Sequence, residues 1–383
     1  MSLHDHSAPA SLGLAQRIRS FGWGLLVLLT MVAGTGFLVL YSAANGSFDP
    51  WADAQMIRFT IGVVLMVVIG LTNLKLWLRL AYPLYGVALL LVVAVEIMGD
   101  IGMGAQRWID LGFFQLQPSE VMKIAIVLAL ARYFHGCTAE DIRRPVTLLL
   151  PLAMVAAPSL LVLRQPDLGT TGMLILGAGA TFFVAGVRAW KFLVVLALFG
   201  ASLPVGWSML HEYQRQRVLT FMDPSRDPLG AGYHITQSKI ALGSGGITGK
   251  GFMQGTQSHL SFLPEKQTDF IFTMYAEEFG LVGGILLLLL FVSVVLYALS
   301  VSLRARTVFG RLVAAGVGTT FFLYYFINIA MVMGLIPVVG VPLPMVSYGG
   351  TQMMTLMIAF GLLACVNTHR DVQLRRQPGL EGY

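Results

Sequence analysis

Residues 262–303 read FLPEKQTDFIFTMYAEEFGLVGGILLLLLFVSVVLYALSVSL, and this stretch indicates the class of fold. Its second part, 281–303, contains no charged side chain. About 20 apolar residues are enough for a helix to cross a bilayer, so this run predicts a membrane-spanning helix. The first part concentrates charged residues directly before that run, which raises the question of what surrounds them.

The composition of the whole chain supports a membrane protein. Of its 383 residues, 56% are hydrophobic and 11% are charged, whereas a soluble protein is typically about one quarter charged. The net charge is +6, but the lysines and arginines are scattered between apolar runs and form no basic face for nucleic acid. The sequence therefore predicts an all-α, polytopic membrane protein forming a single domain over 1–383.

Ten apolar segments have the length of a transmembrane helix. They lie near 22–43, 56–73, 77–98, 118–134, 146–163, 168–187, 191–208, 281–303, 310–334 and 350–367. The first segment is too long for the apolar part of a cleaved signal peptide. We therefore expect ten transmembrane helices.

Basic residues orient these helices. With ten spans, the short connections rich in Lys and Arg all fall on one side, together with both termini. The positive-inside rule makes that side the cytoplasm. The long connection 209–280, between spans 7 and 8, is then extracytoplasmic.

The two cysteines, Cys137 and Cys365, are expected in a cytoplasmic loop and inside a helix, so neither predicts a structural disulfide. The sequence has no zinc-type Cys/His spacing and no dedicated cage for a divalent cation.

Several ionisable residues lie at the predicted outer helix ends, where function is the default hypothesis. Glu120 and Lys123 are three residues apart and could simply pair with each other. Asp167 could act only as the N-cap of the next helix. Arg107, beside Trp108, is either an interfacial anchor or a clamp for a substrate phosphate.

The opening stretch offers further candidates. Asp269 would lie in the first turn of a helical extension, where a carboxylate is favoured even without a catalytic role. Glu277 and Glu278 follow near the hydrocarbon edge, so at least one should face protein or a cavity.

A glycine-rich loop, GSGGITGKG at 243–251, precedes this stretch. Its glycines permit positive φ and close backbone approach. The loop is either a flexible linker or an ordered lid whose amides and Lys250 face sugar or phosphate.

Motifs along the outer side resemble the SEDS family (shape, elongation, division and sporulation), which includes RodA and FtsW. They are, in order, GAQRWIDLG, QPSEVMK, RQPDLGTT, GSGGITGKG, FLPEKQTDFIFTMYAEEFG and VPLPMVSYGG. They extend from about span 3 to span 10 and look more similar to RodA than to FtsW, although Gln106 departs from many relatives.

The resemblance implies a peptidoglycan glycosyltransferase that uses lipid II in the bacterial cytoplasmic (inner) membrane. The important aspartate of the family falls on Asp269, and its polar outer positions fall on Arg107, Glu120, Lys123 and Asp167. The implied partners are a class B penicillin-binding protein and the elongation complex of the MreB cytoskeleton, in cell-wall synthesis and cell-shape maintenance.

The chemistry suggests roles for these residues. Joining two disaccharides needs a base for the attacking hydroxyl, for which Asp269 is the candidate. It also needs positive charge at the leaving diphosphate, for which Arg107 and Lys123 are candidates and to which a divalent cation could add. One inverting displacement gives the β-linkage.

Three other interpretations remain open from the sequence: a lipid II flippase, a scaffold for the penicillin-binding protein, and an FtsW-type division polymerase. The partner's helix could dock on span 9 through Ala314 and Gly318, because small residues permit close helix packing. Alternatively, this small face packs inside the bundle.

Overall fold

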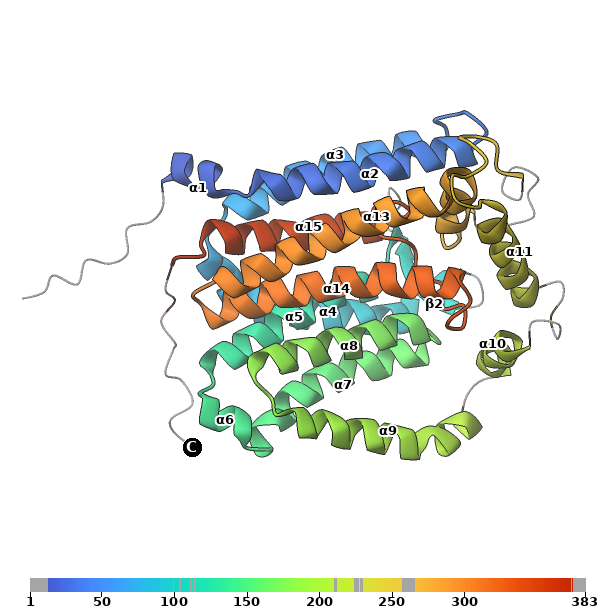
Figure 1. Cartoon of the computed structure of the whole chain (residues 1–383). Coiled ribbons are helices and arrows are strands. Elements are labelled where there is room, and N and C mark those ends of the chain that lie inside the picture. Colours follow the sequence, from blue (N-terminus) through green and yellow to red (C-terminus); the bar gives the residue numbers. More distant parts are fainter. Residues whose placement is uncertain are drawn as a thin grey trace, which may run out of the picture.

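The structure is a computed structural model. It describes residues 13–98, 100–102, 105–110, 112, 115–209, 212–223, 227, 230–256, 266–372 and 374. Most of these residues are helical, and the helices run roughly side by side in one bundle (Figure 1).

Ten helices coincide with the ten apolar segments of the sequence. They are α2 (Trp23–Ala43), α3 (Ala52–Leu71), α4 (Leu74–Met98), α5 (Pro118–Gly136), α7 (Leu149–Arg164), α8 (Leu168–Ala185), α9 (Ala189–Met209), α13 (Ile271–Arg304), α14 (Val308–Val332) and α15 (Gly350–Thr368). Eight of them are long and apolar enough to cross a membrane. The other two are α5, which carries three charged residues, and α9, whose apolar part spans only 189–204. The chain is thus a helical protein of the multi-pass type.

Short elements lie at the two ends of the bundle (Figure 1). At one end are α1 (Leu14–Ser20), α6 (Ala139–Arg143) and the 3₁₀ turn η1 (Val146–Leu148). At the opposite end are α10 (Glu212–Met222), α11 (Ala231–Ser244) and a small sheet of β1 (Asp100–Gly102), β2 (Ala105–Asp110) and β3 (Gln115–Leu116). We refer to the end with α11 and the sheet as the sheet end.

An antiparallel sheet, in the order β1-β2-β3, lies between spans 3 and 4, so the expectation of an all-α protein is corrected there. Its strands are too short for a clear alternating pattern in the sequence, and their pairing satisfies the backbone polar groups beside the membrane.

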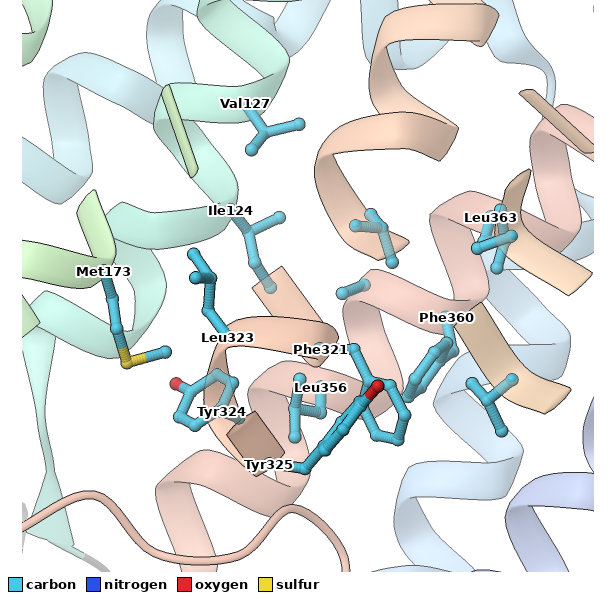
Figure 2. Close-up of a cluster of buried hydrophobic side chains, with 14 of the residues drawn as sticks. Ile124, Val127, Met173, Phe321, Leu323, Tyr324, Tyr325, Leu356, Phe360 and Leu363 are labelled. Atoms are coloured by element: carbon cyan, nitrogen blue, oxygen red, sulfur yellow. The ribbon is translucent and has the colours of Figure 1, made fainter. Parts of the chain in front are cut away.

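The helices α14 and α15 form the centre of the bundle, since α14 packs on α13, α8 and α5, and α15 packs on α3. Figure 2 shows two sides of α14: Phe321 and Tyr325 lie towards Phe360 of α15, whereas Tyr324 lies on the side of Met173 of α8. The rings of Phe321 and Phe360 are 5.3 Å apart. In contrast, α9 lies at the edge of the bundle, and most of its described side chains are exposed.

The helix α13 is broken near its start. Gly280 has φ 65° and ψ −164°, so residues 271–279 form a separate helical segment ahead of the apolar run. This agrees with the expected extension before span 8. The prediction about the paired carboxylates is also confirmed, because Glu277 and Glu278 are both buried within the protein.

The small face of span 9 lies inside the bundle. Ala314 is fully buried, and a Cβ on Gly318 would stand 2.8 Å from the Cβ of Ala298 in α13. Of the two alternatives that the sequence left open, packing of this face inside the bundle is therefore confirmed, with α13 as the neighbouring helix. Periodic small residues indicate close packing, but they do not identify the neighbouring helix.

Both cysteines are free thiols, Cys137 just after α5 and Cys365 buried in α15.

Candidate active site at the sheet end

A buried ion pair lies at the start of α5. The Nζ atom of Lys123 is 2.6 Å from Oε1 of Glu120, and both side chains are at most 6% exposed. The hydroxyl of Tyr324 donates to Oε2 of the same carboxylate, and the Lys123 amine lies 4.3 Å from the centre of the Tyr324 ring. The local pairing expected from the sequence is present, and Tyr324 is a third member that the sequence analysis missed.

This arrangement neutralises Lys123 and fixes its direction. A buried cation is expensive unless a carboxylate and further polar contacts compensate it. Here the carboxylate is itself held by a tyrosine on the central helix. The Lys123 amine therefore has a fixed position, and its side chain does not have to be ordered when substrate binds.

Asp167 caps α8 and also contacts Arg107. Its carboxylate accepts hydrogen bonds from the amide and the hydroxyl of Thr170, at 3.0 and 2.9 Å. The Nε of Arg107, on β2, is 3.8 Å from Oδ2 of Asp167. The N-cap prediction is confirmed, and the same carboxylate serves a second purpose as the counter-charge of Arg107.

Arg107 is held by main-chain oxygens just after α7. Its guanidinium donates to the main-chain oxygens of Gln165, at 3.3 Å, and Pro166, at 2.8 Å, at the end of α7. Its side chain remains 26% exposed.

Asp269 lies in a turn that precedes α13. The helix α13 begins at Ile271, with Phe270 as its N-cap. Asp269 therefore lies two residues before the helix and not, as the sequence predicts, in its first turn. Asp269 is partly exposed. A Cβ on Gly340 would stand 3.4 Å from its Oδ2, which places the loop before α15 directly against the carboxylate.

The turn of Asp269 is fixed by that loop and by α14. Asn328 Nδ2 donates to the main-chain oxygen of Asp269 at 2.8 Å and to that of Val341 at 2.7 Å. The hydroxyl of Ser347 donates to Thr268 O at 2.6 Å, and the amide of Tyr348 donates to Gln267 O at 2.8 Å. Main-chain oxygens of three successive residues, 267–269, thus accept hydrogen bonds from α14 and from the loop before α15, and these bonds fix the turn.

The helix α14 joins the two groups. Tyr324, which holds the Glu120–Lys123 pair, and Asn328, which holds the turn of Asp269, are four residues apart and so share one face of the helix. On the other side, Gly169 of α8 contacts Val339, next to Gly340. The structure therefore brings Arg107, Glu120, Lys123, Asp167 and Asp269 to the same end of the bundle, on elements that pack on each other.

Lys250 belongs to a separate contact. Its Nζ is 2.7 Å from Oε1 of Glu277 and 2.8 Å from the hydroxyl of Thr256. The amide of Thr256 donates to the same Glu277 oxygen at 2.9 Å. Glu277 is fully buried, so Lys250 supplies the charge that it needs, while the lysine side chain is still 27% exposed.

The glycine-rich segment 243–251, whose first two residues end α11, packs on the first segment of α13. The amides of Lys250 and Gly251 donate to the main-chain oxygens of Glu277 and Glu278, both at 3.0 Å, and the amide of Gly249 donates to Gly245 O. The expected cradle of amides facing a sugar or phosphate is therefore wrong for these three groups. The loop is a strap over α13 rather than a flexible linker.

Among the residues that the structure describes, no three His, Cys, Asp or Glu side chains form a group that could hold a metal ion. The carboxylates at the sheet end instead have cationic partners, as Asp167 and Glu120 show.

The missed residues carried a weak signal. Tyr324 and Asn328 are polar groups within an otherwise apolar run, FFLYYFINIA at 321–330. Polar groups at membrane depth indicate a partner or a function, but the sequence does not give the partner.

Comparisons with known proteins agree with this geometry. The sequence profile of the FtsW/RodA/SpoVE family of cell cycle proteins matches residues 22–372. This chain belongs to that family.

Individual relatives match over nearly their full length. The chain is 44% identical over 350 residues to the peptidoglycan glycosyltransferase MrdB of Escherichia coli (strain K12), covering 91% of this chain and 93% of the relative. It is 31% identical to the peptidoglycan glycosyltransferase RodA of Treponema pallidum, over 90% of this chain and 97% of that protein.

Solved structures show the same fold. One comes from work on the structural coordination of polymerization and crosslinking by a peptidoglycan synthase complex; it has a TM-score of 0.78 and 32% identity, with 91% of this chain and 98% of that chain covered. The rod shape determining protein RodA of Thermus thermophilus gives a TM-score of 0.70 and 27% identity, with 92% and 98% covered.

Proposed function

We propose that this chain is a peptidoglycan glycosyltransferase that polymerises lipid II for cell elongation and rod shape. The observation that carries the proposal is the 44% identity to a peptidoglycan glycosyltransferase over 93% of that relative's length. The ionisable residues gathered at one end of a membrane bundle are consistent with it, because lipid II keeps its chain in the bilayer while its sugars react in water.

The proposal includes a membrane topology. Ten helices span the inner membrane, the end with α1 and α6 is cytoplasmic with both termini, and the sheet end with the loop 209–280 is extracytoplasmic. In support, Asn367 near the C-terminal end of α15 donates to the main-chain oxygen of Ser20, at the end of α1. The last long helix therefore ends where the first long helix begins.

In the proposed mechanism, the carboxylate of Asp269 accepts the proton of the attacking sugar hydroxyl. Arg107 and Lys123 stabilise the negative charge of the departing diphosphate, and Asp167 and Glu120 hold these two cations in place. Their positions are fixed before substrate arrives, which lowers the reorganisation cost of the transition state. The nucleophile attacks opposite the leaving group, so the configuration inverts and no covalent intermediate forms.

The proposed mechanism has two further contributions, from Lys250 and from a divalent cation. The exposed side of Lys250 could contact sugar or phosphate once the strap meets substrate, although its amine is shared with Glu277. A divalent cation bound to the diphosphate would add positive charge there.

The partners in this proposal are a class B penicillin-binding protein and the MreB elongation complex. A structural neighbour from a peptidoglycan synthase complex that coordinates polymerization and crosslinking supports a transpeptidase partner.

One experiment separates this function from the alternatives. The purified chain is incubated with labelled lipid II, in detergent and in liposomes, with and without the penicillin-binding protein. We expect polymer in detergent. Movement of lipid II across liposome membranes without polymer would identify a flippase. If neither polymer nor movement is observed, even with the penicillin-binding protein present, the chain acts as a scaffold. Rescue of elongation but not of division in depleted cells distinguishes the RodA-type from the FtsW-type role.

A further inference from the structure

Arg58 is a cation on α3 that the mechanism above does not use. It lies six residues into the helix, roughly 9 Å along its axis from the sheet end at 1.5 Å per residue. Its neighbours Ile57 and Ile61 are 60% and 49% exposed, which is typical of a helix surface that faces lipid. A guanidinium at such a depth is costly without a compensating charge.

The protein itself supplies only part of that compensation. The Nη2 atom donates to the hydroxyl of Tyr348 at 3.1 Å, and the guanidinium carbon lies 4.7 Å from the centre of the same ring. The Nη1 atom is buried and has no hydrogen-bond partner among the described residues. Arg58 also forms no ion pair with a described carboxylate, whereas Arg107, Lys123 and Lys250 each do.

Tyr348 connects this cation to the turn of Asp269. Its amide donates to Gln267 O, two residues before Asp269, and the preceding Ser347 donates to Thr268 O. Gln55, one turn before Arg58 on α3, donates to Ser347 O at 2.9 Å. Two side chains of α3 therefore contact Ser347 and Tyr348, and these two residues in turn contact the proposed catalytic turn.

We propose that Arg58 binds the phosphate group of a lipid at the sheet end, and that this lipid is a polyprenyl-diphosphate substrate. This inference rests on the proposed function, because glycan polymerisation brings two polyprenyl diphosphates to one aspartate. The Glu120–Lys123 pair is linked to the Asp269 turn through Tyr324 and Asn328 of α14, and Arg58 is linked to it through Tyr348. Arg107 lies beside the start of α8, which approaches the loop before α15 at Gly169. Arg58 is partly exposed and has no ion pair with a described carboxylate, so an anionic phosphate at its accessible side provides the counter-charge that the described protein groups do not.

The test measures lipid binding to the purified, detergent-solubilised chain by native mass spectrometry. The probes are undecaprenyl diphosphate, phosphatidylglycerol and diacylglycerol. Arg58→Gln should weaken undecaprenyl diphosphate binding by about tenfold, the effect of one charge-assisted hydrogen bond. Arg58→Lys should retain part of that affinity, and Tyr348→Phe should weaken it less than Arg58→Gln does.

A matched control is Arg132→Gln. Arg132 also stacks on a tyrosine, with its guanidinium carbon 4.3 Å from the Tyr82 ring centre, and donates to a main-chain oxygen, but it lies at the opposite end of the bundle. It should leave undecaprenyl diphosphate binding unchanged. The melting temperature of each variant verifies that the fold is intact, and Arg58→Lys remains informative should Arg58→Gln fail to fold.

The outcomes are distinct. Loss of undecaprenyl diphosphate binding alone supports the substrate site. An equal loss for phosphatidylglycerol overturns the substrate assignment and identifies a general phospholipid contact. Unchanged binding of both phosphate lipids in folded Arg58→Gln overturns the proposal. Wild-type binding without lipid II polymerisation would refute the proposed function while the assignment of Arg58 as a phosphate contact stands.

Discussion

At the scale of single residues, the sheet end shows one recurring arrangement: each of three proposed functional residues is held by a polar neighbour. Asp167 holds Arg107, Glu120 holds Lys123, and Asn328 holds the main chain of Asp269. Buried charges need such partners for stability. The same partners fix the geometry that electrostatic catalysis requires.

Asp269 provides the most direct test. Asp269→Asn preserves the size of the side chain and leaves the bonds from Asn328, Ser347 and Tyr348 in place, because these bonds go to main-chain atoms of the turn or the adjacent loop. It removes the basic carboxylate, so we expect at least a hundredfold loss of lipid II polymerisation, the low end of general-base contributions. The melting temperature and co-purification with the penicillin-binding protein should be unchanged. Polymer at near wild-type rates would rule Asp269 out as the base.

The pair Glu120–Lys123 separates structure from function. Lys123→Met alone leaves a buried carboxylate without its cation and should destabilise the protein by about 3–5 kcal/mol. Glu120→Gln with Lys123→Met removes both charges and should fold much closer to wild type. If Lys123 contacts the diphosphate, this stable double variant is still inactive.

The measurements for that pair are thermal unfolding in detergent and the lipid II assay. The charge-swapped variant, with Glu120→Lys and Lys123→Glu, serves as the control, since it restores a pair but moves the cation. An active double variant would show that the pair is purely structural.

At the scale of elements, the strap 243–251 and the first segment of α13 form one unit through main-chain contacts. Strap amides donate to carbonyls of Glu277 and Glu278, and the amides of Leu281 and Val282 donate back to Gly246 O and Ile247 O. The break at Gly280 frees these amides from the helical pattern. The ion pair of Lys250 and Glu277 closes the unit on its buried side.

Two glycines of this strap make a matched test. Gly249 and Gly246 both have positive φ, at 82° and 55°. A Cβ on Gly249 would stand 2.0 Å from Glu278 O, whereas a Cβ on Gly246 would meet nothing within 4 Å. Gly246→Ala should therefore cost only about 1–2 kcal/mol for the left-handed backbone. Gly249→Ala should cost distinctly more, because the strap must separate from α13.

Thermal unfolding and limited proteolysis of the strap measure this difference. We expect Gly249→Ala to expose the strap to protease and to reduce polymerisation, with Gly246→Ala near wild type in both. Equal behaviour of the two variants would mean that the close contact with Glu278 does not hold the strap.

At the scale of the whole molecule, the bundle is built around α14 and α15, while helices such as α9 lie at its edge. In lipid, no hydrophobic force drives helices together, so close packing through small residues contributes most of the contact. The contact of Gly318 with Ala298 is one such point between α14 and α13.

Gly318→Leu should therefore impair folding rather than partner binding. The Cβ atom of the added side chain would by itself lie 2.8 Å from Ala298 Cβ. Overpacking of this kind typically costs about 1–3 kcal/mol or more. The matched control is Phe326→Leu on the same helix, since Phe326 is 52% exposed. We expect a lower melting temperature and yield for Gly318→Leu alone. Normal stability with specific loss of the penicillin-binding protein would restore α14 as the docking helix.

The sequence by itself determined the class of the protein, the positions of its long helices and the presence of a polar cluster at one side. These properties are local, because the length of an apolar run and the cost of a charge in lipid can be judged without knowing any neighbour. For the same reason it correctly indicated the N-cap at Asp167, the Glu120–Lys123 pair and the burial of at least one of Glu277 and Glu278.

Only the tertiary structure decided which groups meet. Tyr324 holding Glu120, Asn328 holding the turn of Asp269, Lys250 neutralising Glu277 and Tyr348 against Arg58 all join elements far apart in the chain. The same holds for the small face of α14, whose pattern permits close packing but does not specify whether α13 or another protein fills it. Each of these contacts depends on how helices are placed in three dimensions, and hydrophobic length and spacing along one helix do not contain that information.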